Sequence, residues 1–416
     1  MNDYAAGNGL INRRVLLTRA VRGGAVAGAG LLIPGVSQGR PDWMRRPGGP
    51  MSETGAPSNY EAHVVRRNIA SRPGTAGSGA SRTPLGHLDG IITPSRLHFE
   101  RHHGGIPDID PANHQLRIDG MVARPLLFSV EDLLRYPIVS RIQFLECSGN
   151  SSGLIRPKPA KLDVTALHGL VSCSEWGGVP LHYLLDEAGI KPEGKWVIAS
   201  GADSAALNRS VPLDKVLDDA IVALYQNGER LRPANGYPMR LFLPGWEGNA
   251  SVKWLRTLSV TDQPAMSREE TSKYTDLRDD GTAHMFTFPM GVKSVITAPS
   301  PGIGMHEKGI YQISGIAWSG AGSITRVEVS ADGGRSWAYA ALDTHVLPQA
   351  LTRFRIGWDW QGQDAVLLSR ATDSLGNIQP TREQNMQGRA RGSFYHVNAM
   401  QAWSVDESGA LENTYV

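Results

Sequence analysis

The chain has 416 residues, of which 41% are hydrophobic and 20% are charged, and its formal net charge is +2. This length exceeds one ordinary hydrophobic core and predicts two globular domains. The balanced charge gives no indication of a nucleic-acid-binding surface, and the 47 glycines and 26 prolines indicate many turns.

The N-terminus has the pattern of an export signal. Arg13 and Arg14 precede a short apolar run, rich in Gly and Ala, that reaches Ile33. The run is about half as long as a bilayer span requires, and such a run behind paired arginines is typical of Tat signals, which export folded proteins. We therefore predict a Tat signal over residues 1–38, a periplasmic protein, and no membrane span in the mature chain. A basic, unstructured terminus is the alternative.

Residues 39–92 are predicted to form a flexible arm. The segment 71–84 is of low complexity and rich in Gly, Ser and Pro, so it is not expected to pack. Ordered structure is expected to begin near Leu97.

From about residue 93 to residue 290, short strand-like and helix-like segments alternate, which predicts an α+β domain. Helices are expected over residues 129–135, where Ser129 is an N-cap before acidic residues, and over residues 179–189, which end at a glycine. The Rossmann fingerprint is absent. Strands are expected over residues 116–120, 142–146, 196–200 and 239–243.

After residue 290 the pattern becomes all-β. Apolar and polar residues alternate in several segments separated by turn residues, which predicts an immunoglobulin-like sandwich over residues 291–416, including a C-terminal tail. Its strands are expected over residues 311–318, 324–330, 352–360 and 366–372.

The chain has two cysteines, Cys147 and Cys173. In an oxidising compartment they could form a disulfide, and the chain could then be a non-catalytic exported binding protein. Cys147, however, follows a strand-like run and precedes the small residues 148–150, where a bulky group could approach the backbone. A thiolate is also a good ligand for a soft metal.

Motifs on both sides of Cys147 carry a resemblance to a known family. They include residues 99–107 (Phe-Glu-Arg-His-His-Gly-Gly-Ile-Pro), residues 235–240 (Asn-Gly-Tyr-Pro-Met-Arg) and residues 252–255 (Val-Lys-Trp-Leu). With them the chain resembles the sulfite oxidase family of molybdopterin enzymes from residue 95 to the C-terminus. The resemblance implies a sulfite-oxidase-type mixed molybdopterin domain, followed by the family's β-rich dimerisation domain.

Within that family, the sequence is most similar to the molybdenum subunit of sulfane dehydrogenases. The similar segments are residues 146–151, 168–176, 232–238 and 243–249. That subunit works with a separate c-type cytochrome subunit. In agreement, the chain has no Cys-x-x-Cys-His motif for attaching a haem of its own.

The resemblance implies roles for individual residues. Cys147 is expected to bond molybdenum, and Arg101 and His103 are expected to lie along the pterin and the substrate pocket. Arg240 is expected to bind the pterin phosphate, since phosphate and dithiolene are anionic and suit Arg and Lys donors. The other expected cofactor contacts are Phe99, His102, Asp203, Asn235, Ser251, Val252 and Lys253.

Two positions depart from the family pattern. Sulfite oxidases have a sulfite-binding arginine five residues after the ligand cysteine, where this chain has Ser152. Loss of that contact puts tight binding of free sulfite in doubt. The family's pocket tyrosine corresponds to Leu224 here, and Tyr225, one residue later, is the candidate for its catalytic role, which is otherwise lost.

The resemblance thus implies molybdenum-dependent oxidation of sulfur by oxo transfer, with electrons passed to a c-type cytochrome. The substrate is expected to be sulfane sulfur on a carrier protein, and the alternative is free sulfite with a soluble cytochrome c. Ser152 favours the first. The expected assembly is a homodimer, or a heterotetramer with the cytochrome.

Overall fold

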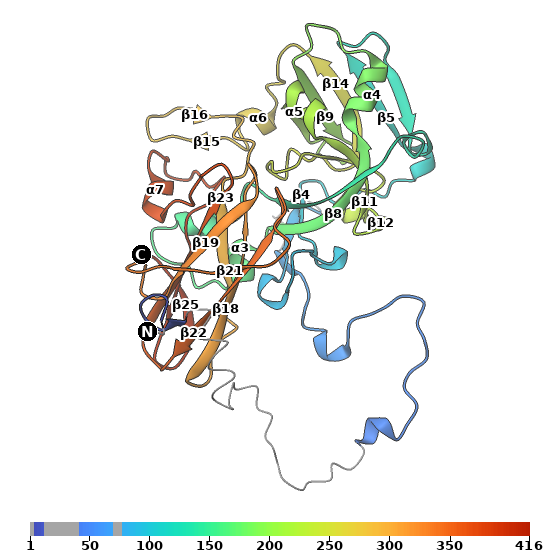
Figure 1. The fold of residues 1–416 in the computed structure, drawn as a ribbon. Coiled ribbons are helices and arrows are strands. Elements are labelled where there is room, and N and C mark those ends of the chain that lie inside the picture. The colour runs from blue at the N-terminus through green and yellow to red at the C-terminus, as the bar shows by residue number, and fades with distance from the viewer. Residues whose placement is uncertain (1–3, 12–40, 70–76) are drawn as a thin grey trace.

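The computed structural model describes residues 4–11, 41–69 and 77–416. Arg13 and Arg14, which carry the predicted Tat signal, lie outside these residues. Figure 1 shows a first body that includes β5, β9 and β14 and, nearer the second body, β8 and β11; the second body is built around β18, β19, β22 and β23. No helix among the described residues is long and apolar enough to cross a membrane.

Two five-stranded sheets form the first body. One has the strand order β10-β9-β14-β5-β6, and the other has the order β12-β11-β8-β7, with β13 paired to β11. All neighbours are antiparallel except β14 and β5, which are parallel. The strands are β5 (Gln115–Gly120), β6 (Leu126–Ser129), β7 (Val139–Glu146), β8 (Val171–Pro180), β9 (Trp196–Gly201), β10 (Asn208–Pro212), β11 (Ile221–Gln226), β12 (Glu229–Arg230), β13 (Arg240–Phe242) and β14 (Leu255–Thr261).

The helices are short, and both predicted helices are present. Ser129 caps its helix as expected, because its Oγ accepts a bond from the backbone N–H of Asp132, whose carboxylate in turn accepts the N–H of Ser129. The second ends at Gly189, whose φ of +71° suits a glycine C-cap. The α-helices are α2 (Val130–Leu133), α3 (Val164–His168), α4 (Leu181–Ala188), α5 (Leu213–Asp218), α6 (Arg268–Thr271) and α7 (Arg382–Met386).

The second body is the expected all-β sandwich. Its sheets have the orders β1-β22-β18-β17, with β21 paired to β22, and β20-β19-β23-β24-β25. One hydrophobic core, which includes the fully buried Trp318, Trp358 and Trp403, joins them. The strands are β1 (Leu10–Ile11), β17 (Lys293–Ala298), β18 (Gly309–Trp318), β19 (Ile324–Ser330), β20 (Ala338–Tyr339), β21 (Ala341–Leu342), β22 (Thr352–Trp360), β23 (Ala365–Asp373), β24 (Ala402–Val405) and β25 (Leu411–Thr414).

Strand β1 lies in the segment that was assigned to the export signal. Leu10 pairs with Trp358, and both side chains are fully buried. The indole N–H of Trp358 donates to the backbone oxygen of Asn8 at 2.7 Å. Residues 4–11 therefore pack as part of the sandwich.

The expectation that order begins near Leu97 is wrong. Residues 42–63 are exposed, but β2 (Arg67–Ile69), β3 (Gly79–Arg82) and β4 (Glu100–His102) form a three-stranded sheet, and Leu85 is buried. Small residues let the chain approach closely, since a Cβ at Gly77 (φ +71°) would lie 2.5 Å from the Cα of Gly105. A final hairpin pairs β15 (Asp276–Leu277) with β16 (Ala283–His284).

The two bodies share a core at their junction. Phe144 from β7 and Val171 and Cys173 from β8 pack in the same hydrophobic cluster as Trp318 and Met290. Because β7 runs directly into Cys147, this junction places the cysteine beside the second body.

Candidate cofactor and active site

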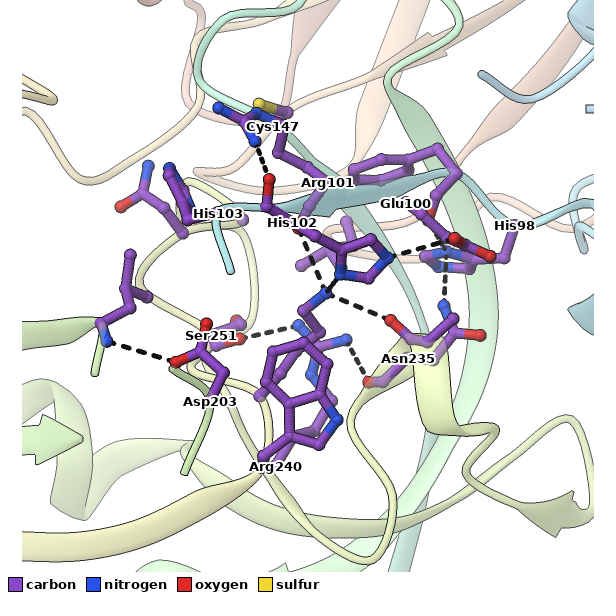
Figure 2. Close-up of a pocket in the computed structure, with 18 of the residues that line it drawn as sticks. His98, Glu100, Arg101, His102, His103, Cys147, Asp203, Asn235, Arg240 and Ser251 are labelled. Atoms are coloured by element: carbon purple, nitrogen blue, oxygen red, sulfur yellow. Dashed lines mark hydrogen bonds and ion pairs between the residues drawn. The ribbon is translucent and has the colours of Figure 1, made fainter. Parts of the chain in front are cut away.

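Cys147 lines a cavity that encloses about 700 Å³ of space not filled by atoms, including its opening (Figure 2). Ten of the twelve residues predicted from the sequence line it: Phe99, Arg101, His102, His103, Cys147, Asp203, Asn235, Arg240, Ser251 and Lys253.

The turn that carries Cys147 is held by its own backbone and by Asn150. The N–H of Cys147 donates to the oxygen of Leu170, and its oxygen accepts the N–H of Asn150 at 2.9 Å. The Asn150 side chain donates to Glu146 and accepts the N–H of Leu170. Burial raises the pKa of the Cys147 thiol, and the nearby Arg101 opposes that shift.

Two of the predicted site residues do not reach this cavity. Tyr225 lies on β11, its side chain packs against the core of the first domain, and the Arg230 guanidinium stacks on its ring at 5.0 Å. Val252 has both backbone groups bonded within the protein, to Ala250 and Leu241. Its side chain is buried in the core. The catalytic role of Tyr225 and the backbone contact of Val252 therefore stay predictions, without support from the lining of this cavity.

Arg240 places a buried positive charge at the cavity wall. Its guanidinium donates to the backbone oxygens of Asn235 and Ser251, at 2.9 and 2.7 Å, and lies over the Trp176 ring. Its Nε has no partner among the described residues, and no described carboxylate forms an ion pair with it. Burial lowers the pKa of Arg240 to about 9, which reflects a cation that lacks a compensating anion.

Lys253 is a second buried cation in the same wall. Its ammonium donates to the backbone oxygens of Arg101 and Ala234, both at 3.1 Å, and to Nδ1 of His102 at 2.7 Å. His102 in turn bonds Glu100 through Nε2 at 3.1 Å. Burial lowers the pKa of His102 to about 3, so the ring is neutral and can accept from Lys253. Burial also lowers the pKa of Lys253, and Arg240 adds to the effect.

The lining of the cavity fits an anionic cofactor. Buried charges are normally paired, yet Arg240 and Lys253 bond mainly to neutral oxygens and to a neutral ring, and the Nε2 of His98 beside them is also unpartnered among the described atoms. A phosphate would supply the missing negative charge and accept these donors. With the thiol of Cys147 in the same cavity, the residues present fit a molybdopterin whose metal takes one thiolate from the protein.

A second, wider cavity adjoins the first. It encloses about 1550 Å³ of space including open solvent, and Arg101, His103, Cys147 and Tyr274 line both cavities. Ser152, at the position where sulfite oxidases are expected to have an arginine, lines the wider cavity. The wider cavity is also lined by three basic residues that the sequence did not indicate, Arg82, Arg268 and Lys273. This space therefore carries positive charge even though residue 152 is not an arginine.

Aromatic side chains complete the boundary between the cavities. Tyr274 is buried, its hydroxyl bonds Nε2 of His103 at 2.9 Å, and the Arg209 guanidinium lies 5.1 Å from its ring. Burial raises the pKa of Tyr274 and lowers that of His103 to about 4, so both groups are neutral. Phe394 and Tyr395, from the segment between α7 and β24, line the wider cavity.

The two cysteines are free thiols. Phe144 and Cys173 are paired across β7 and β8, and Cys173 is fully buried in the shared core. The disulfide of the alternative interpretation is therefore absent, and with it the argument for a bridged, non-catalytic binding protein.

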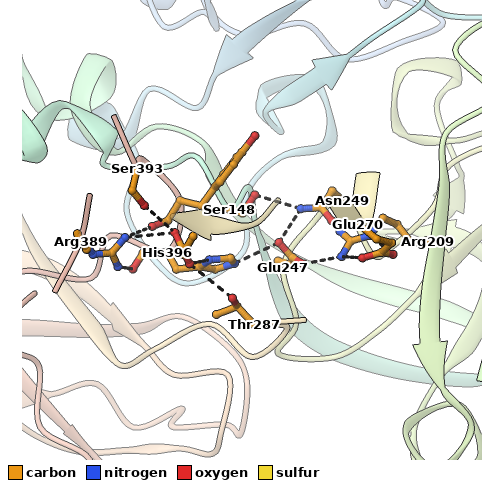
Figure 3. Close-up of polar contacts among 11 residues, drawn as sticks. Ser148, Arg209, Glu247, Asn249, Glu270, Thr287, Arg389, Ser393 and His396 are labelled. Carbon is orange, nitrogen blue, oxygen red and sulfur yellow. Dashed lines mark hydrogen bonds and ion pairs between the residues drawn. The ribbon is translucent and has the colours of Figure 1, made fainter. Parts of the chain in front are cut away.

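A buried chain of alternating charges lies near Ser148, the residue after Cys147, and is linked to it through Asn249 (Figure 3). Arg209 donates to Glu270 and Glu247, each at 2.9 Å, and His396 bonds Glu247 at 3.1 Å and Asp276 at 2.8 Å. Burial alone would lower the pKa of His396, but the two carboxylates raise it to about 9. Burial would likewise raise the pKa of Glu247, but Arg209 and His396 lower it to about 2.

Family models match both domains. Residues 103–269 match the oxidoreductase molybdopterin binding domain, and residues 284–402 match the Mo-co oxidoreductase dimerisation domain. Together with the cavity, these matches define the chain as a molybdopterin-binding oxidoreductase.

Individual relatives narrow the class. Sulfite oxidase of Gallus gallus is 32% identical over 70% of this chain and 68% of its own length. Nitrate reductase [NADH] of Solanum lycopersicum is 29% identical, and the chain spans 39% of it. The crystal structure of the sulfane dehydrogenase SoxCD from Paracoccus pantotrophus superposes with a TM-score of 0.87 at 44% identity, covering 90% of this chain and 97% of that one. The chain belongs to the sulfite oxidase family.

Proposed function

We propose that the chain is the molybdenum subunit of a sulfane dehydrogenase, which oxidises a sulfur atom at the outer end of a larger anionic substrate. The observation that carries this proposal is the wide cavity on the solvent side of Cys147, lined by Arg82, Arg268 and Lys273. A free sulfite ion needs only a small pocket, whereas a sulfur group on a carrier protein needs room for the arm that bears it. The similarity to SoxCD supports the same choice.

The protein's own residues have separable tasks. Arg240 and Lys253 would hold the cofactor phosphate, and Cys147 would bond the metal. When bound, the cofactor would supply a metal that changes oxidation state as an oxygen atom passes from water to sulfur. Arg101 and the basic residues of the wide cavity would orient an anionic sulfur group. Tyr274 and His103 share one hydrogen bond and can hold a proton beside Cys147.

The electrons and the location are further parts of the proposal. Each oxygen atom gained by the sulfur from water releases two protons and two electrons, and a separate c-type cytochrome would take the electrons. The matched dimerisation domain supports a homodimer or a heterotetramer with that cytochrome. The predicted Tat signal supports a periplasmic location.

The decisive experiment is steady-state turnover of the cofactor-loaded chain with its cytochrome partner. Sulfane sulfur bound to a carrier protein is compared with free sulfite at matched concentrations. A higher kcat/KM for the carrier-bound sulfur is expected, while a higher value for sulfite would replace the proposal with sulfite dehydrogenase.

The role of Cys147 is tested separately by Cys147→Ser, with Cys173→Ser as the matched control. Loss of the Mo(V) electron paramagnetic resonance signal of the native enzyme is expected only for the first variant. An unchanged signal in Cys147→Ser would refute the ligand assignment, whatever the substrate.

A further inference from the structure

The residue before Cys147 is held by the sandwich domain. Glu146 ends β7, is fully buried, and accepts three hydrogen bonds through its carboxylate. One comes from Asn150 in its own turn, at 2.9 Å. The other two come from the sandwich: the ammonium of Lys293 on β17, at 2.5 Å, and the indole N–H of Trp318 on β18, at 2.7 Å.

The residue after Cys147 is held by the sandwich as well. The backbone N–H of His396 donates to the oxygen of the buried Ser148 at 2.8 Å. The Ser148 hydroxyl accepts from Asn249 at 3.0 Å, and Asn249 also donates to Glu247, at 2.8 Å. Since the His396 ring bonds the same Glu247 carboxylate, this histidine reaches the cysteine turn by two routes (Figure 3).

These polar contacts fix the geometry of the cysteine turn, and the two domains do not need them in order to associate. The apolar junction around Phe144 and Trp318 already joins the two domains. A buried ion pair such as Lys293–Glu146, in which both side chains are at most 1% exposed, adds little net stability over apolar residues of similar size. Its geometry, however, fixes the carboxylate and thereby the end of β7. Lys293 also donates to Ser151, at 3.3 Å, on the far side of the same turn.

We propose that the sandwich domain positions Cys147 in the active site, with Lys293 and Trp318 holding the residue before it and His396 holding the residue after it. These are positioning residues that act through Glu146 and Ser148. The second domain is then required for the geometry of the metal ligand in addition to assembly. The inference rests on the proposed ligand role of Cys147, but it makes no use of the substrate.

The first test uses the full chain purified without cofactor and follows alkylation of Cys147 by iodoacetamide, with the buried Cys173 as an internal reference. Lys293→Met and Trp318→Phe are compared with wild type. Lys161→Met serves as the matched control, since it removes an exposed ion pair between the molybdopterin domain and Glu412 of the sandwich. Loosening of the turn should raise the rate at Cys147 at least about fivefold in Lys293→Met, less in Trp318→Phe, and not in the control.

The second readout is the Mo(V) electron paramagnetic resonance spectrum of the loaded variants, in which altered g-values are expected if the thiolate moves. Folded variants with the alkylation rate and the spectrum of wild type would overturn the inference. If Lys293→Met does not fold, Trp318→Phe still decides, because it keeps the ion pair and removes one donor. A different outcome would contradict the proposed ligand role of Cys147 instead: the alkylation rate changes in the positioning variants, but the Mo(V) spectrum stays the same even in Cys147→Ser.

Discussion

At the scale of single residues, the cavity is distinguished by positive charges that have no carboxylate partner within the described chain. Arg240 and Lys253 are both buried, and their bonds go to backbone oxygens and a neutral histidine. Such an arrangement is unfavourable in an empty protein interior and favourable around an anion. The two unpaired positive charges thus favour binding of a phosphate-bearing ligand, independently of the metal.

Arg240→Met should weaken retention of the cofactor. Removing a charge-assisted contact to a buried anion costs about 2–5 kcal/mol, which corresponds to about 30-fold or more in affinity. Molybdenum and pterin content per chain, measured after dialysis, should fall accordingly. Arg230→Met, which removes an arginine that stacks on Tyr225 outside the cavity, should retain both, and equal content in the two variants would contradict the prediction.

Tyr274→Phe should reduce turnover, whereas Tyr225→Phe should not. The first substitution removes the hydroxyl that bonds His103 beside Cys147, and the second changes a side chain that packs outside the cavity. Loss of a buried hydrogen bond of about 1–2 kcal/mol in the reacting geometry predicts a decrease in kcat of about tenfold. Equal kcat values for the two variants would show that Tyr274 has no part in the reaction.

The residues that could be predicted from the sequence lie in short contiguous motifs, and the residues that were missed do not. Cys147, Arg240 and Lys253 each stand in a recognisable run with fixed spacing. Tyr274 and Tyr395 stand in irregular segments, where neither periodicity nor a motif indicates which way a side chain points. Tyr225 was chosen because it is adjacent to the family position, but its side chain packs against the core of the first domain, beside a break in the pairing of β11 with β8.

At the scale of elements, the cysteine turn is packed against a glycine from another loop. Gly248 donates its N–H to the oxygen of Glu146 at 2.7 Å, and a Cβ at Gly248 would lie only 2.9 Å from that oxygen. The end of β7 and the loop after β13 can therefore approach this closely only with glycine at residue 248.

Gly248→Ala should displace the cysteine turn and destabilise the protein. Overpacking of this kind costs about 1–3 kcal/mol, which for a protein of this size lowers the Tm by several degrees. Gly304→Ala is the matched control, because a Cβ at Gly304 meets only the oxygen of Gly409, at an ordinary 3.6 Å. The prediction is checked by thermal unfolding together with molybdenum content, and equal values for the two variants would contradict it.

Strands and helices with a regular pattern of apolar residues could be predicted from the sequence, whereas strands that form only through pairing with a distant segment could not. The predicted strands of the sandwich and the Ser129 cap are present because alternation and capping are local properties. The sheet of β2, β3 and β4 was missed because β3 is made of Gly79, Ala80, Ser81 and Arg82. Such residues have low strand propensity, and this strand depends on pairing with β4.

At the scale of the whole molecule, a buried charge network joins the two domains. His396, from the segment between α7 and β24, bonds Glu247 and Asp276, and the Arg389 side chain donates to its backbone oxygen. Arg209 bonds Glu247 from the other side and is itself paired with the buried Glu270. The carboxylates dominate over the arginines, so the network favours the protonated imidazole.

Stability should depend on pH through His396. Its pKa is raised from 6.5 to about 9 in the folded protein, so the folded state binds the proton more tightly than the unfolded state. The stabilisation is fully present below about pH 6.5 and is lost as the pH rises through 9, and its size is about 3 kcal/mol. The difference in unfolding free energy between wild type and His396→Gln should therefore shrink by about that amount between pH 6 and about pH 9.5.

Urea unfolding of both proteins across this range checks the prediction, and the comparison cancels groups that titrate equally in both. His345→Gln, at an exposed histidine of the same domain, should show no such trend. A pH-independent difference for His396→Gln would show that folding leaves the pKa of His396 unchanged, which would contradict the prediction. Since Glu247 also contacts Asn249 and, through it, the turn of Cys147, alkaline loss of this proton should also loosen the junction that holds the cysteine.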